Sequence, residues 1–231
     1  MIYYGGEALE TVAPVKIVDI VDSGVQIVPK TRDRPIRPGT DFVRNHLSER
    51  TITVTFALLT QDMLARNAQI ESLLKWAYSR EPKRLELPTK QGRYLMAVCT
   101  QLPGPSARQW FESSLTLVFT CYDPFWYDVA EHHASCGSTA FFVNGSAEPV
   151  MRIEDTLDAA AQRVYSDGSD TMTFTLVPAG DLVIDLEQQT AQVDGVSCMD
   201  QFTFASSFIL PHTGQTTITG SGTVYWRERW L

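Results

Sequence analysis

The sequence of 231 residues has no apolar run that approaches the ~20 residues needed to span a membrane. Residues 1–6 have neither the basic region nor the apolar core of a secretory signal peptide. The four cysteines show no Cys-x-x-Cys spacing, and several lie in apolar strand patterns. These absences favour a protein that is made and folded in a cytoplasm, with free, buried thiols.

Motifs for catalysis and cofactor binding are also missing. The sequence contains no nucleophile elbow and no glycine-rich phosphate loop. The best metal-like cluster is His132, His133 and Cys136, but zinc needs three or four fixed ligands and a fourth is not evident. We interpret this segment as a solvated loop between domains, and we predict no metal and no cofactor.

Three acidic residues near a predicted hairpin, Asp181, Asp185 and Asp194, are the remaining candidates for chemistry. Paired carboxylates can hydrolyse glycosides when the fold holds them at the right separation. Asp185 lies between two apolar residues, which places it on the outer face of a strand. A solvated strand face is the favoured interpretation, sugar or Ca²⁺ binding is the alternative, and we predict that the protein is not an enzyme.

Charge is distributed unevenly along the chain. Residues 1–129 hold 15 Lys+Arg and 14 Asp+Glu, whereas residues 130–231 hold 4 Lys+Arg and 13 Asp+Glu. Two such different surfaces favour two domains, 1–130 and 131–231. The acidic second half argues against nucleic-acid binding there, because phosphates would be repelled.

The first half has the pattern of an α+β domain. Residues 15–21 and 25–28 are predicted strands around a turn at Asp22-Ser23-Gly24. A basic loop with three prolines follows at 29–41, and then residues 51–58 alternate as a half-buried strand. Helical spacing, with Met63, Leu64, Ile70, Leu73, Leu74 and Ala77 on one stripe, predicts a helix capped by Thr60 that runs to about Arg80. Strands at 84–87, 93–99 and 111–121 complete an antiparallel sheet.

The second half has many short strands separated by turn signals. They are predicted at 139–143, 150–153, 171–177, 182–186, 190–194, 201–205, 216–219 and 223–230, with one helical turn near 155–161. This spacing is typical of a β-sandwich. The predicted fold class is therefore mostly β, with one substantial helix in the first domain.

Aromatic residues gather where the strand ending at Cys121 runs into Pro124. Proline cannot donate to a sheet ladder, so it ends the strand. Tyr122, Phe125, Trp126 and Tyr127 are of the types enriched at interface hot spots. They either form a subunit interface or pack the connection between the domains.

Two further groups have alternative interpretations. Lys30, Arg32, Arg34 and Arg37 could lie against nucleic acid, but Asp33 and Asp41 dilute their charge, so a contact between subunits or an exposed loop is preferred. Trp226 and Trp230 could stack on a sugar ring, or they could close the core of the sandwich.

The order of these parts resembles the distal tail proteins of siphovirus-type bacteriophages over nearly the whole chain. In the first half, the resemblance rests on the basic loop, residues 49–54, Leu73-Leu74, and the strand that ends in Tyr-Asp-Pro-Phe-Trp at 122–126. In the second half, it rests on segments 144–149, 183–185, 193–195 and 225–231.

The resemblance implies a structural tail-tip protein whose N-terminal domain closes into a hexameric ring, singly or in stacked rings, with a galectin-like β-sandwich outside it. The implied partners are further copies of the chain, the tail-tube protein and a tail-associated fibre or lysin protein, with DNA only in transit and no membrane. The implied location is the virion tail tip, after synthesis in the bacterial host. The alternative function is a carbohydrate-binding module that recognises host cell-wall sugar through the second domain.

Overall fold

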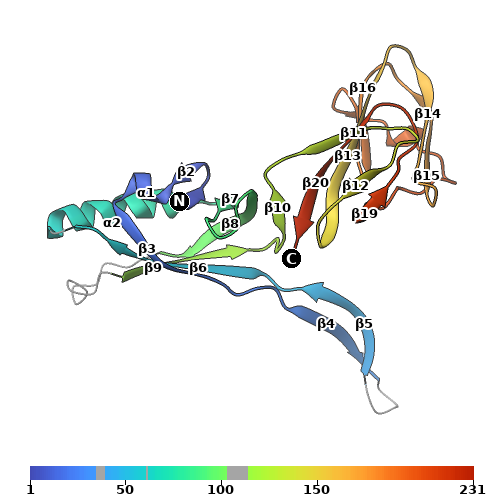
Figure 1. Ribbon diagram of the computed structural model, residues 1–231. Coiled ribbons are helices and arrows are strands. Elements are labelled where there is room, and N and C mark those ends of the chain that lie inside the picture. The colour runs from blue at the N-terminus through green and yellow to red at the C-terminus, as the bar shows by residue number, and fades with distance from the viewer. Residues whose placement is uncertain (35–39, 61, 103–113) are drawn as a thin grey trace. The chain divides into compact units, whose positions relative to one another are not determined.

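The computed structural model describes residues 1–34, 40–60, 62–102 and 114–231 (Figure 1). The chain divides into two compact units, residues 1–126 with Leu231, and residues 127–230. We call them unit 1 and unit 2. Strands predominate in both, which confirms the predicted mostly β fold class. No helix among the described residues has the length and apolarity to cross a membrane.

The main sheet of unit 1 is antiparallel and has the strand order β3-β6-β9-β8-β7-β1-β2. Its strands are β1 (Tyr3–Tyr4), β2 (Glu7–Ala8), β3 (Val15–Asp22), β6 (Arg50–Leu58), β7 (Lys83–Glu86), β8 (Arg93–Gln101) and β9 (Ser114–Cys121). Strict burial of alternate residues along β6 confirms the predicted period of two. Residues 111–113 of the predicted strand at 111–121 lie outside the described residues.

Two helices belong to unit 1, α1 (Leu9–Val12) and α2 (Met63–Ala77). The indole of Trp76 donates to the carbonyl of Glu7 at 3.1 Å and packs edge-on against Tyr4 and Phe119. These aromatic rings join α2 to the sheet, and the Tyr4 hydroxyl is satisfied by the carbonyl oxygen of Ala97 at 3.2 Å.

Three details of the predicted helix are wrong. Its N-cap is Asp62 rather than Thr60, because the Asp62 carboxylate accepts the amides of Leu64 and Ala65 at 3.3 and 3.4 Å. Leu64 is exposed, since it lies nine residues, about two and a half turns, before the fully buried Leu73 and so faces the other way. The helix ends at Ala77, before the predicted end near Arg80.

The predicted turn at residues 22–24 does not join paired strands. β3 pairs with β6, whereas β4 (Ile27–Asp33) pairs with β5 (Thr40–Leu47) in a separate two-stranded sheet. The prediction of a loop from residue 29 is also wrong, because 29–33 are part of β4. Pro29 is tolerated there because a two-stranded sheet leaves one side of each strand without a ladder.

Unit 2 contains a larger antiparallel sheet with the order β18-β17-β16-β13-β20-β11, and two small sheets, β14–β15 and β12–β19. Its elements are β11 (His132–Ser135), β12 (Phe141–Val143), β13 (Ala147–Leu157), β14 (Ala161–Ser166), β15 (Thr171–Val177), β16 (Gly180–Asp185), β17 (Thr190–Val193), β18 (Val196–Ser197), a 3-10 turn η1 (Met199–Gln201), β19 (Gly214–Thr216) and β20 (Thr223–Trp230). Strand β10 (Trp126–Asp128) contains the division between the units.

The core of unit 2 combines the large sheet with the small ones. Ile153 and Ile184 from the large sheet, Phe174 and Tyr165 from β14–β15, and Val143 from β12 belong to one buried cluster. A core between layers of sheet is the arrangement expected of a β-sandwich.

Two predictions for unit 2 are wrong. The helical turn near 155–161 is absent from this described segment, because β13 continues to Leu157 and keeps its alternating burial. The strand predicted at 201–205 is replaced by η1 and a single bridge between Phe202 and Phe174.

Candidate assembly surfaces

The β4–β5 pair, which we call the ribbon, is the most exposed regular structure in unit 1. Within unit 1 it extends away from the sheet that contains β3 and β6 (Figure 1). Gln26 and Ser48 are hydrogen-bonded to each other at its base. The amide of Ser48 donates to the carbonyl oxygen of Gln26 at 2.8 Å, and the amide of Gln26 donates to the hydroxyl oxygen of Ser48 at 2.9 Å. A two-stranded hairpin alone is marginally stable in water. Among the described residues, its strands pair only with each other.

Apolar side chains project from the ribbon and from the neighbouring strand. Phe42 is 65% exposed, and Ile27 and Val43 are also exposed. On β3, Val18 and Val21 are exposed, and a bulge beside Val18 interrupts the ladder with β6. β3 is an edge strand, so it offers backbone groups as well as apolar side chains.

The predicted basic interface residues lie on or beside the ribbon. Arg32 is exposed on β4, opposite Asp41 in the register. Arg34 is exposed and its Nε donates to Asp41 Oδ1 at 2.6 Å. Arg37 lies outside the described residues. The positive charge of this surface is thus partly neutralised, which suits contact with a protein better than tight binding of phosphates.

The aromatic residues after β9 divide into exposed and buried ones. Tyr122 is 66% exposed, and Phe125 and Tyr127 are half-buried. Trp126 is buried, so its assignment as a candidate interface residue is corrected. Its ring lies under the guanidinium of Arg50, 5.7 Å from the ring centroid, and it is one of the buried side chains of unit 1.

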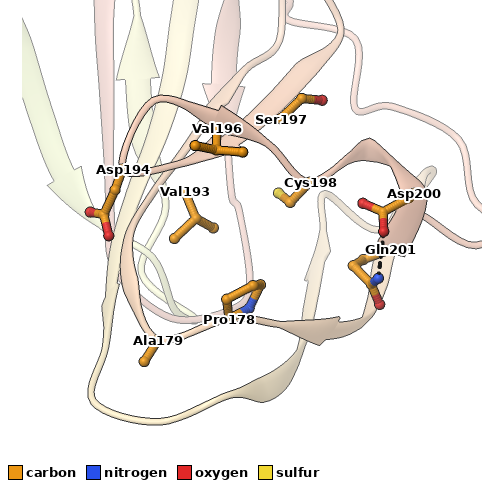
Figure 2. A pocket seen from close by; sticks show the side chains of 9 residues that line it. All are labelled: Pro178, Ala179, Val193, Asp194, Val196, Ser197, Cys198, Asp200 and Gln201. Carbon is orange, nitrogen blue, oxygen red and sulfur yellow. Dashed lines mark hydrogen bonds between the residues drawn. The ribbon is translucent and has the colours of Figure 1, made fainter.

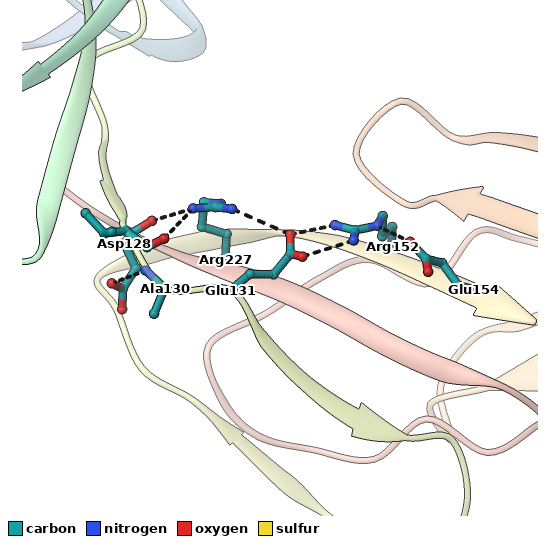
Figure 3. Close-up of polar contacts among 7 residues, drawn as sticks. Asp128, Ala130, Glu131, Arg152, Glu154 and Arg227 are labelled. Carbon is teal, nitrogen blue, oxygen red and sulfur yellow. Dashed lines mark hydrogen bonds and ion pairs between the residues drawn. The ribbon is translucent and has the colours of Figure 1, made fainter. Parts of the chain in front are cut away.

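A chain of charged groups fixes the first residues of unit 2 (Figure 3). Arg227 Nη1 donates to the carbonyl oxygens of Asp128 and Val129 at 2.8 and 3.0 Å. Arg152 donates through both terminal nitrogens to Glu131, at 2.6 and 3.0 Å. The bond from Arg152 holds the pKa of Glu131 below its usual range. Segment 128–131 is thereby tied to β13 and β20.

The two tryptophans proposed for sugar binding differ in exposure. Trp226 is only 6% exposed and stacks on Phe141 with the ring centroids 4.5 Å apart. It belongs to the core, so its assignment to a sugar platform is corrected. Trp230 is half-buried and stays a candidate.

The three residues considered from the sequence as a metal-like cluster do not converge in the described structure. His132 and His133 are neighbours in β11, so their rings point to opposite faces: the ring of His132 stacks on Trp226, and the ring of His133 lies tilted against Tyr225. Cys136 packs against the core of unit 2. The interpretation of this segment as a solvated loop is wrong for 132–135, because these residues form β11 beside β20.

The three aspartates of the predicted hairpin have structural partners. Asp194 accepts the amide of Asp181 at 3.0 Å, and Asp181 accepts the hydroxyl of Thr156 at 2.9 Å. Asp185 caps the turn after β16 by accepting the amides of Glu187 and Gln188, each at 2.9 Å. These roles account for the carboxylates without catalysis.

A hollow of about 360 Å³ lies beside β17 and β18 (Figure 2). Pro178, Val193 and Cys198 contribute apolar surface, and Asp194 and Asp200 contribute carboxylates. None of its nine lining residues is aromatic, so it lacks the ring platform on which a sugar would stack.

Comparison with known proteins identifies the family. The model of the phage tail protein RIFT-related domain matches residues 4–194, which is more than half of the chain. The chain belongs to this family. It is therefore a component of a phage tail, and its family is one of structural proteins. Among curated proteins, none matches the sequence.

Solved structures agree with this assignment at the level of the fold. The crystal structure of the Dit protein of phage SPP1, described as a paradigm of the hub adsorption apparatus in phages that infect Gram-positive bacteria, has a TM-score of 0.80 and 17% identity, covering 100% of this chain and 98% of that one. Two structures of the phage p2 baseplate in its activated conformation, with Sr and with Ca, have TM-scores of 0.50 and 0.51 and identities of 9% and 8%. They cover 94% of this chain and 91% and 90% of theirs. The predicted resemblance to distal tail proteins is confirmed.

Proposed function

We propose that this chain is the hub of a phage or prophage tail tip, where six copies close into a ring. The ring joins the tail tube to the tail-associated fibre or lysin protein and leaves a bore through which DNA passes. The protein acts mechanically, as a platform for the adsorption apparatus, and not as an enzyme. The number of copies follows from the resemblance to distal tail proteins, and the contacts that close the ring are inferred from unit 1.

The ribbon is the observation that carries this proposal. Within the described residues, its strands pair only with each other. The side chains of Phe42, Ile27 and Val43 on the ribbon are exposed to solvent. Burial of such side chains against another copy contributes about 25 cal/mol for each Å² of apolar surface removed from water. A neighbouring copy therefore supplies the stabilisation that the isolated ribbon lacks.

A ring also needs two different surfaces on each copy, so that every copy repeats the same contact with the next. The ribbon provides one such surface. The edge of β3 provides a second one, because among the described residues β3 pairs only with β6, and Val18 and Val21 are exposed on it. A heterologous contact between unlike surfaces closes into a ring when the rotation between copies fits.

The experiment measures the mass of the purified chain by light scattering over a concentration series, with negative-stain imaging of the same samples. We expect hexamers with a central hole. Phe42→Asp should shift the population toward monomers, because it introduces a charge into the proposed contact. Phe204→Asp is the matched control, since Phe204 is fully exposed on unit 2.

Both variants should keep the melting temperature of the wild-type monomer, which separates assembly from folding. A monomer at every concentration, alone and after addition of the tail-tube protein, would refute the ring. Binding of that monomer to a cell-wall extract would then favour the carbohydrate-binding alternative, for which Trp230 is the candidate to replace first.

A further inference from the structure

Three potential metal ligands converge at one place in unit 2. Asp128, His132 and Glu228 each offer one ligand atom, and these atoms all lie within 4.8 Å of one another. The strand register explains this. His132 lies opposite Trp226 in the β11–β20 ladder, and Glu228 is two residues beyond Trp226 on the same face of β20. Asp128 is brought to them by the short segment that precedes β11.

The imidazole of His132 is held in place by its surroundings. Its ring stacks on the indole of Trp226, with centroids 5.6 Å apart and planes 25° apart. Its Nε2 lies 3.3 Å from Oδ2 of Asp128. This separation is long for a hydrogen bond. It matches two donors that share one tetrahedral zinc ion, which lie about 3.4 Å apart when each is about 2.1 Å from the metal.

Glu228 brings a buried negative charge to the cluster. Its side chain is 4% exposed, and its Oε1 accepts hydrogen bonds from two neutral donors, the amide and the Nδ2 of Asn144, at 2.8 and 3.0 Å. Within the described part of the chain, no lysine or arginine forms an ion pair with it. The arginines on either side of it, Arg227 and Arg229, alternate to the opposite face of β20 and reach Glu131 and Glu187. A buried carboxylate without a cation is costly, so this position favours a positive charge in the cluster.

We propose that Asp128, His132 and Glu228 bind a divalent first-row transition ion, with zinc as the representative ion. An imidazole with two carboxylates is a donor set that suits zinc and its neighbours, whereas Ca²⁺ and Mg²⁺ prefer oxygen ligands alone. Three protein ligands leave positions for water. The site is distinct from the trio of His132, His133 and Cys136, because only His132 is common to both.

The ion would cross-link the first residues of unit 2 to its last strand, β20. Asp128 and His132 belong to the segment that enters the unit, Glu228 belongs to the last strand, and Asn144 adds the loop after β12. An ion that binds the folded state alone raises the melting temperature, and the rise grows with the logarithm of the ion concentration relative to its dissociation constant. The proposal does not depend on the ring.

The test uses the full chain after treatment with EDTA and dialysis. Isothermal titration with Zn²⁺ should show one site per chain, and Zn²⁺ should raise the melting temperature more than Ca²⁺ does. Co²⁺ in place of zinc should give visible absorption bands from the bound ion. Glu228→Gln and His132→Gln should each weaken binding by about tenfold or more, since loss even of a group that orients a ligand costs that much.

His133→Gln is the matched control, because it removes a histidine from the same strand but from the opposite face. Its zinc affinity should equal that of the wild type. If Glu228→Gln does not fold without metal, Asp128→Asn replaces it as the second variant. The absence of stoichiometric zinc binding, or binding that survives in both ligand variants, or binding lost equally in His133→Gln, would overturn the proposal.

Discussion

Arg50, which is buried, forms an ion pair with the partly exposed Asp22, with Nη1 of Arg50 2.7 Å from Oδ2 of Asp22. The same guanidinium donates from Nε to the carbonyl of Pro124 at 2.9 Å and lies over the ring of Trp126. One side chain on β6 thus joins the end of β3 to the break in the chain after β9. Arg50 holds both residues in position, because it donates a hydrogen bond to the carbonyl of Pro124 and covers one face of the ring of Trp126.

Replacement of Arg50 by methionine should destabilise unit 1 by about 2 to 4 kcal/mol. Removal of Arg50 leaves the carbonyl oxygen of Pro124 without its buried donor and the carboxylate of Asp22 without its partner, and the partial exposure of Asp22 reduces the second cost. Urea denaturation measures the free energy of unfolding. Arg80→Met, at an exposed position in the same unit, is the control and should change it by less than about 0.5 kcal/mol. Equal effects of the two variants would show that Arg50 contributes little.

Asp155 makes unit 2 sensitive to acid. Burial disfavours its charge, but hydrogen bonds from Ser221 at 2.6 Å, Arg163 at 2.6 Å and Tyr165 at 3.1 Å outweigh this and hold its pKa below the ordinary value. Its ionised form therefore contributes stability that is fully present above the unfolded-state pKa of about 3.9. This contribution is lost as the pH falls through the lower pKa of the folded state.

Asp155→Asn should accordingly lower the free energy of unfolding at pH 7 by about 1 to 3 kcal/mol, since it removes the charge that Arg163 and Ser221 bind. The difference from the wild type should shrink below pH 4. Denaturation series at pH 7, 5 and 3 check this. Asp158→Asn, an exposed neighbour beyond the end of β13, should leave the pH dependence unchanged. A loss of stability that is the same at all three pH values would contradict the role assigned to the ionised carboxylate.

Local patterns in the sequence were sufficient for much of the fold. The alternation in β6 depends only on neighbouring residues, and the sheet that it belongs to was predicted. The partner of a strand is a long-range property, so the sequence did not show that β3 pairs with β6 rather than with β4. The prolines at 29–41 led to the interpretation of this segment as a loop. Pro29 nevertheless lies in β4, because each strand of the two-stranded ribbon lacks one ladder partner and tolerates a residue without an amide hydrogen.

The candidate surfaces were less predictable. The sequence does not show that Tyr122 is exposed whereas Trp126 is buried. The arginine that covers Trp126, Arg50, is about 75 positions away in the chain. The cluster of Asp128, His132 and Glu228 joins residues about 100 positions apart, through a strand at 132–135 that was interpreted as a loop. Only the spacing of Asp128 and His132 was visible in the sequence.

The cap of α2 provides a direct comparison between sequence and structure. Asp62→Ala should destabilise the protein by about 1 kcal/mol, because two amides at the start of the helix lose their acceptor. Thr60→Ala should cost less than about 0.5 kcal/mol, since Thr60 precedes the cap. Thermal or urea unfolding of both variants measures the difference. The reverse order would restore Thr60 as the cap.

The four cysteines should resist alkylation while the protein is folded. All are free thiols, and burial raises the pKa of Cys121 to about 12 and the pKa values of Cys99 and Cys136 to about 11. Burial also raises the pKa of Cys198. Because the thiolate is the reactive form, iodoacetamide at pH 7.5 should label the native protein slowly and all four sites rapidly in 8 M urea. Mass spectrometry after timed quenching assigns each site. Rapid labelling of Cys121 in the folded protein would show that the core of unit 1 opens often, and it would contradict the tight packing around β9.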